Sequence, residues 1–101
     1  MVDLRRYTRA PIDIEVEFVR KGSTERRKGR ATDLSLGGMF VQSANPLPFS
    51  TEVVIYMLVP GQRAALAIPG VVRWGRADGM GIQFGLLGAR ETHAITELTK
   101  D

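Results

Sequence analysis

The chain has 101 residues, 44% of them hydrophobic and 25% charged, which suits one small folded domain and excludes a disordered tail. It contains no cysteine, so disulfides and thiolate metal sites are excluded. The net charge is +3, and nine of the 14 Lys and Arg residues lie in the first 30 positions, which indicates an anionic partner at that end of the chain.

The N-terminal segment and the first two strands are predicted from charge and alternation. Residues 1–10 show no clear periodicity and carry three arginines, so a flexible Arg-rich arm is expected. Apolar and acidic residues then alternate through residue 18, which is typical of a half-buried strand. Its core-facing side chains would be Ile12, Ile14, Val16 and Phe18. Residues 21–23 predict a turn, and residues 26–34 predict the returning strand.

Two glycines interrupt the pattern after the second strand. Gly37 and Gly38 predict a tight turn or a bulge with the backbone at positive φ. Residues 39–41 resume as a short strand, and two prolines place residues 45–48 in a loop. Residues 52–59 form a continuous apolar run rich in β-branched side chains, which predicts a further strand.

The last third of the chain predicts a hairpin and a helix. Residues 64–68 and 71–74 form either one long strand interrupted by a Pro-Gly pair or two short strands. Asp78-Gly79 predicts a hairpin turn, and residues 80–84 alternate again. Residues 88–99 change to a helical period, so we expect a short amphipathic helix. Its buried stripe would contain Ala94, Ile95 and Leu98.

These elements predict an all-β fold. About six short strands with frequent turns are typical of a closed or nearly closed antiparallel barrel. The barrel would span residues 11–85, and the helix would cover one opening or one face of it. We expect residues 1–101 to form a single domain.

Two short motifs stand at the ends of the first two strands. Arg5 and Arg9 form R-x-x-x-R before the first strand, and Asp33, Ser35 and Gly38 form D-x-S-x-x-G where the second strand ends. Two later elements follow: Val72-Arg73-Trp74 and Gly79-Met80-Gly81-Ile82-Gln83-Phe84. Neither motif alone is specific, but their order and spacing resemble the PilZ family over residues 4–98. The family pattern has the same two motifs, followed by V-x-W and G-x-G-[IV]-x-F strands.

The resemblance implies a six-stranded antiparallel PilZ-type barrel with a C-terminal helix. It also implies a receptor for the bacterial second messenger cyclic di-GMP. No other cofactor is expected, and no metal is expected because no His, Cys or carboxylate cluster has ligand spacing. Arg6, between the paired arginines, is expected to add a contact, and Trp74 matches an aromatic residue near the ligand in many family members. The ligand-binding residues that the resemblance implies are Arg5, Arg6, Arg9, Asp33, Ser35, Gly37, Gly38 and Trp74.

The chemistry of these residue types fits such a ligand. The guanidinium plane of Arg can donate two parallel hydrogen bonds to a phosphate, stack on a purine, or donate to guanine O6 and N7. The carboxylate of Asp33 can accept from guanine N1–H and N2–H₂, and adenine has no matching pair of donors. Ser35 can add a hydroxyl bond, and glycine lets the backbone approach a ligand closely.

Less specific interpretations stand beside these predictions. The arginines can be a solvated charge run, and Trp74 an ordinary core aromatic residue. Asp33 and Ser35 can belong to a polar turn that satisfies its own backbone. Two other functions are also open. One is a PilZ-like adaptor that binds proteins and no nucleotide, and the other is a small basic barrel that binds RNA or single-stranded DNA.

The sequence does not favour an enzyme. His93 is the only histidine, and no nucleophile elbow surrounds Ser35. No apolar signal core is present at the N-terminus, and the longest apolar run, residues 53–60, is far shorter than a membrane span. We therefore expect a cytoplasmic receptor, monomeric or weakly dimeric, without membrane insertion and without a nucleic acid polymer as partner. An unidentified downstream protein would control motility, pili or surface matrix.

Overall fold

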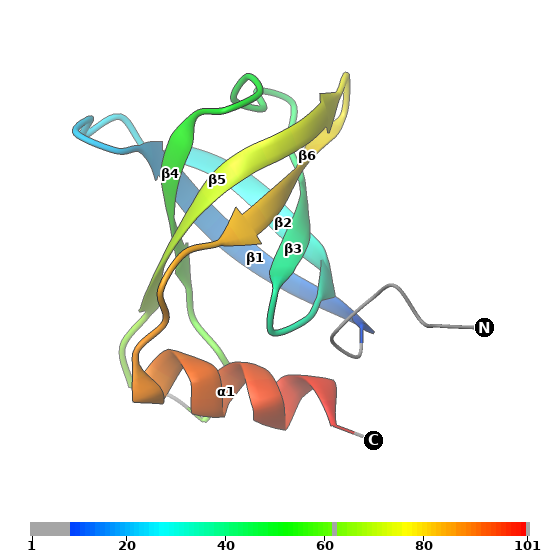
Figure 1. The fold of residues 1–101 in the computed structure, drawn as a ribbon, viewed down its shortest axis with the longest axis vertical. Helices are drawn as coiled ribbons and strands as arrows, with labels where there is room; N and C mark the ends of the chain where they lie inside the picture. The colour runs from blue at the N-terminus through cyan, green and yellow to red at the C-terminus, as the bar shows by residue number, and fades with distance from the viewer. Residues whose placement is uncertain (1–8, 62, 101) are drawn as a thin grey trace.

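Residues 9–61 and 63–100 are described by a computed structural model, and within these ranges the chain forms six strands and one helix (Figure 1). In chain order the elements are β1 (Ala10–Arg20), β2 (Arg27–Leu34), β3 (Gly38–Gln42), β4 (Glu52–Met57), β5 (Leu66–Arg76), β6 (Gly79–Phe84) and α1 (Ala89–Thr99). Each predicted strand is therefore present, with ends that differ from the prediction by a few residues.

The strands close into an antiparallel barrel in the order β1-β2-β3-β6-β5-β4, and β4 pairs back with β1. Alternate side chains point inward from every strand and fill the interior. Phe18, Ile55 and Met80 are among the fully buried ones. In Figure 1, α1 lies across the lower end of the barrel. The predicted six-stranded barrel with a C-terminal helix is confirmed.

The apolar and acidic alternation of β1 separates its two faces as predicted. Val16 is 2% exposed and Phe18 is fully buried, whereas the acidic residues between the apolar ones are exposed or half-buried. Ile12 and Ile14 also pack against the core, but they remain half-buried. The strand continues beyond the alternating residues and ends at Arg20.

β5 is a single strand that runs through Pro69. Pro69 pairs with Val54 of β4, and its carbonyl accepts a hydrogen bond of 2.9 Å from the N–H of Gly85 on its other side. In an antiparallel strand the N–H and C=O of one residue point to the same side. The N–H that proline lacks would therefore point toward Gly85, so the one missing bond falls just beyond the end of β6 and leaves the β5–β6 pairs intact.

The turn between β2 and β3 differs from the prediction in its backbone. The glycines at positive φ are Gly22 (φ 86°) and Gly61 (φ 89°), so Gly37 and Gly38 do not need the left-handed region. Gly38 is required for a different reason, namely close strand packing. A Cβ atom there would lie 2.1 Å from the carbonyl oxygen of Ile82 on the neighbouring β6.

The hairpin between β5 and β6 is displaced by one residue from its predicted position. Arg76 pairs with Gly79, so Ala77 and Asp78 form the turn and Gly79 is the first residue of β6. Gly79 is enclosed, since a Cβ atom there would lie 2.4 Å from Cζ of Phe40. A glycine that sequence reasoning assigned to a turn thus makes room for an aromatic ring.

Helix α1 covers one end of the barrel with the predicted stripe. Ala94 and Ile95 are buried in the core, and Leu98 packs against it as a half-buried residue. Within residues 9–61 and 63–100, no helix has the length and apolar character that a bilayer span requires.

Candidate functional site

One row of cross-strand partners crosses five strands of the barrel and organises the site. Pro11 of β1 pairs with Asp33 of β2, and Asp33 pairs with Phe40 of β3. Phe40 pairs with Gly81 of β6, and Gly81 pairs with Trp74 of β5. The row therefore brings Pro11 and Trp74, which are 63 positions apart in the sequence, into one line across the barrel. It also places Asp33 next to Phe40.

Two aromatic rings meet over the glycine in the middle of this row. The ring centroids of Phe40 and Trp74 are 5.3 Å apart, with 22° between the ring planes. A Cβ atom on Gly81 would lie 2.3 Å from the indole of Trp74, so only glycine lets the indole rest on the β6 backbone. Trp74 is 47% exposed, so it lies at the surface of the barrel and is not part of the core. We call Phe40 and Trp74 the aromatic shelf.

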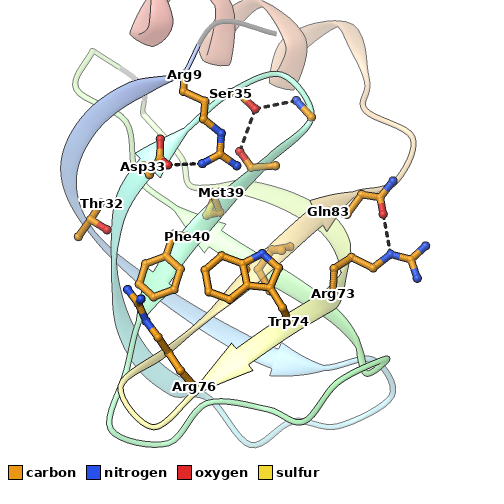
Figure 2. Close-up of a pocket in the computed structure, with 14 residues that line it drawn as sticks. Arg9, Thr32, Asp33, Ser35, Met39, Phe40, Arg73, Trp74, Arg76 and Gln83 are labelled. Carbon is orange, nitrogen blue, oxygen red and sulfur yellow. Dashed lines mark hydrogen bonds and ion pairs between the residues drawn. The ribbon is translucent and has the colours of Figure 1, made fainter. Parts of the chain in front are cut away.

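The end of β2 and the residue preceding β1 meet through an ion pair. Nη1 of Arg9 donates to Oδ2 of Asp33, and the two side chains are 45% and 32% exposed. Both pairing groups therefore remain accessible to a ligand. A member of each sequence motif, Arg9 from the first and Asp33 from the second, lies at this point (Figure 2).

Ser35 shapes the turn that follows Asp33. Its side chain is buried at 6% exposure, and its hydroxyl accepts a 3.1 Å hydrogen bond from the N–H of Gly37. The N–H of Ser35 also donates to the carbonyl of Gly38, at 2.9 Å. The interpretation of Ser35 as a residue that satisfies its own turn is therefore confirmed.

These residues surround one open cavity of about 470 Å³ (Figure 2). Of the residues predicted from the sequence, those that line it are Arg9, Asp33, Ser35, Gly37, Gly38 and Trp74. Arg5 and Arg6 lie outside the described residues, as does most of the predicted arm. The structure thus brings the described part of both motifs together on one cavity.

The cavity also contains residues that sequence reasoning missed. Phe40, Arg73, Arg76 and Gln83 line it together with the predicted ones. Nε of Arg73 donates to Oε1 of Gln83 at 2.6 Å. One signal for the shelf was present in the sequence. If Met80 and Ile82 point inward, Gly79 and Gly81 point outward, and these two glycines leave room for side chains from the neighbouring strands, although the sequence does not tell which ones.

The charge of the cavity is positive. Three arginines, Arg9, Arg73 and Arg76, line it with one carboxylate, Asp33. Planar guanidinium groups around an aromatic surface can bind a molecule that is both anionic and aromatic, because they pair with phosphates and stack on bases. Among the described residues, no group of three or more His, Cys, Asp and Glu side chains is placed to hold a metal ion.

Comparisons with known proteins agree with this fold. The chain resembles the PilZ domain of CeSA from a cellulose-synthesizing bacterium, with 22% identity and a TM-score of 0.74 over 90% of this chain and 93% of that one. It also resembles the PilZ domain of YcgR from Escherichia coli, solved with c-di-GMP, with 15% identity and a TM-score of 0.73 over 96% and 89%.

A third similar structure is the Bacillus subtilis inhibitor of motility (MotI/DgrA), with 18% identity and a TM-score of 0.76 over 97% of this chain and 50% of that one. At these identities the likeness shows the fold. No curated protein sequence matches the chain. The sequence model described as PilZ domain, however, matches residues 3–100, which is nearly the whole chain. The chain therefore belongs to the PilZ domain family.

Proposed function

We propose that this chain is a receptor domain for cyclic di-GMP and that the cavity bounded by Arg9, Asp33 and the aromatic shelf is its binding site. Family membership supports the proposal, and so does the similar PilZ domain of YcgR, which was solved with c-di-GMP. The observation that carries it is the meeting of Arg9 and Asp33 on the cavity that the exposed indole of Trp74 also lines.

The ligand offers two chemistries, and the cavity has a partner for each. Its phosphodiesters stay ionised at neutral pH, and the Arg9 guanidinium can pair with one of them in a bidentate manner. A guanine base can stack on Trp74, whose indole is 47% exposed. Asp33 can then accept from the N1–H and N2–H₂ groups of the base. Ser35, Gly37 and Gly38 would bound the ligand from the turn.

Arg5 and Arg6 complete the proposal as additional cations from the segment before Arg9. Their charges would pair with the second phosphate or with a base face. The proposed switch is the ordering of this arm over the barrel when the ligand neutralises its charge. Equal amide exchange of residues 2–9 with and without cyclic di-GMP would exclude that switch.

Ligand binding is expected to quench the fluorescence of Trp74. This residue is the only tryptophan of the chain, so the tryptophan emission reports on the shelf alone. Stacking of a base on the indole should lower the emission, with half-saturation at micromolar cyclic di-GMP or below. The measurement is a fluorescence titration, with calorimetry of the same samples.

GTP, a single-stranded oligonucleotide and the Arg9→Ala variant are the controls for this titration. We expect no comparable response from any of them. Absence of both heat and quenching with cyclic di-GMP would contradict the proposed receptor and favour the nucleotide-independent adaptor. Salt-sensitive binding of the oligonucleotide would instead favour the basic barrel for RNA or single-stranded DNA.

We further propose that the liganded domain acts on a protein that controls motility, pili or surface matrix. The fold that it shares with an inhibitor of motility supports this direction. A strain that lacks the chain should show an altered swimming, twitching or matrix phenotype, which the wild-type chain restores and the Asp33→Ala variant does not. Equal restoration of the phenotype by the wild-type chain and by Asp33→Ala would show that the cellular role does not depend on binding of cyclic di-GMP.

A further inference from the structure

Arg76 lies over the aromatic shelf although neither sequence motif includes it. Its guanidinium carbon is 4.7 Å from the ring centroid of Phe40 and 5.7 Å from that of Trp74. Its Nε is 3.1 Å from Oδ1 of Asp78 in the turn between β5 and β6. Figure 2 shows Arg76, Phe40 and Trp74 next to one another along one side of the cavity. The guanidinium is therefore held at the shelf by contacts to two rings and a carboxylate.

The arrangement of the shelf determines what Arg76 faces. The backbones of Gly79 and Gly81 fill the inner side of the two rings, since a Cβ on either residue would collide with them. The guanidinium consequently lies on the outer side, over Phe40 more closely than over Trp74. The two ring planes are inclined by 22°, so a base that stacks on Trp74 would lie at a similarly small angle to the Phe40 ring, and the guanidinium carbon, 5.7 Å from the Trp74 ring centroid, is near enough for the guanidinium to reach the edge of that base.

We propose that Arg76 is a specificity-determining residue that reads the O6 and N7 edge of the guanine stacked on Trp74; this inference rests on the proposed binding of cyclic di-GMP. Asp78 engages Nε, so the two terminal amino groups are left to face the base. A guanidinium in the plane of a base can donate to both acceptors of guanine. Adenine presents one acceptor and one donor on that edge, and the donor would meet another donor.

Asp78 acts on the ligand only through Arg76, as a positioning residue. An exposed arginine side chain loses considerable rotamer freedom when it is fixed in one geometry. In this structure the side chains of Arg76 and Asp78 are 59% and 69% exposed, so little else in the described part of the chain constrains the guanidinium apart from the shelf and this ion pair. Asp78 would thus reduce the entropic cost of ordering the Arg76 side chain when the ligand binds.

The test is a cycle of two proteins and two ligands, measured by calorimetry. The proteins are the wild type and Arg76→Ala, and the ligands are cyclic di-GMP and its analogue in which 7-deazaguanine replaces both guanines. The analogue lacks the N7 acceptor and keeps the phosphates and the N1–H and N2–H₂ groups. We expect Arg76→Ala to bind cyclic di-GMP about ten- to a hundredfold more weakly than the wild type.

The loss of N7 should weaken ligand binding only when Arg76 is present. We expect the analogue to bind the wild type about tenfold more weakly than cyclic di-GMP, and to bind Arg76→Ala within about twofold of it. For Arg76→Lys, the ratio of the affinities for cyclic di-GMP and for the analogue should be close to that of Arg76→Ala, because lysine has charge but no planar fork. Asp78→Asn should give an intermediate ratio, which a purely structural role of Asp78 would not produce.

Arg63→Ala is the matched control, since it removes the same charge from the loop that precedes β5, at the opposite end of that strand. It should leave both affinities unchanged. If the wild type binds cyclic di-GMP but the analogue loses the same factor in the wild type and in Arg76→Ala, the assignment of Arg76 is wrong while the receptor function stands. If the wild type does not bind cyclic di-GMP at all, both proposals fail.

Discussion

Replacement of Asp33 by alanine is expected to weaken the binding of cyclic di-GMP at least about a hundredfold, because the N1–H and N2–H₂ donors of a bound guanine would lose a charged acceptor. The free protein should nevertheless melt within a few degrees of the wild type. The ion pair that Asp33 forms with Arg9 is 32–45% exposed at its two side chains, and such exposed pairs contribute at most about 1 kcal/mol. Calorimetry gives the affinity, and thermal unfolding monitored by circular dichroism gives the melting temperature.

The neighbouring Ser35 provides the contrast for this prediction. Its hydroxyl is buried and bonded to the turn backbone, so Ser35→Ala should lower the melting temperature more than Asp33→Ala does. An Asp33→Ala protein that unfolds would show that Asp33 is structural. A folded Asp33→Ala protein with wild-type affinity would show that the carboxylate does not select the ligand. Either result would remove Asp33 from the proposed site.

The largest effect on folding is expected at Gly38. A methyl group there would lie 2.1 Å from the carbonyl oxygen of Ile82, and that oxygen belongs to the backbone of the adjacent strand. Neither strand can move aside without disturbing the β3–β6 pairing. Overpacking of this kind costs about 1–3 kcal/mol or more, so Gly38→Ala should lower the melting temperature by about 10 °C or more, or prevent folding.

Gly75→Ala is the control for the Gly38 variant. Gly75 also lies in a strand, but the nearest heavy atom to a Cβ there, the carbonyl oxygen of Gly79, is 3.8 Å away, which is ordinary contact. Its melting temperature should remain near that of the wild type. A Gly38→Ala protein as stable as Gly75→Ala would mean that β3 and β6 are farther apart than described.

Much of the fold could be predicted from the sequence because its signals are local. The alternation in β1 and β6, the proline-containing loop and the period of α1 each identify an element without reference to any other part of the chain. The meeting of Arg9 and Asp33 was also predictable, since a hairpin of β1 and β2 brings its two far ends together. Arg5 and Arg6 lie outside the described residues, so their ligand contacts stay predictions.

The aromatic shelf and Arg76 were not predicted because they depend on long-range register. Phe40 and Trp74 meet only because β6 inserts between β3 and β5 with Gly81 opposite both of them. An irregularity in β5 between Val72 and Trp74 shifts that register further. No local pattern specifies which residues of β3 will be opposite those of β6, because these two strands are neighbours in the sheet but not in the chain. The cavity therefore contained side chains that only the assembled barrel could reveal.

Closure of the barrel has a consequence for recognition by other proteins. Because β4 pairs with β1, every strand has a hydrogen-bonded neighbour on both sides over part of its length, and in the described residues only short segments such as Ala10–Glu15 of β1 and Arg73–Arg76 of β5 pair on one side alone. A partner that adds a strand of its own would therefore find only a short stretch of sheet edge to pair with. We therefore expect a protein that senses the domain to read mainly its side chains, its connecting loops or its helix.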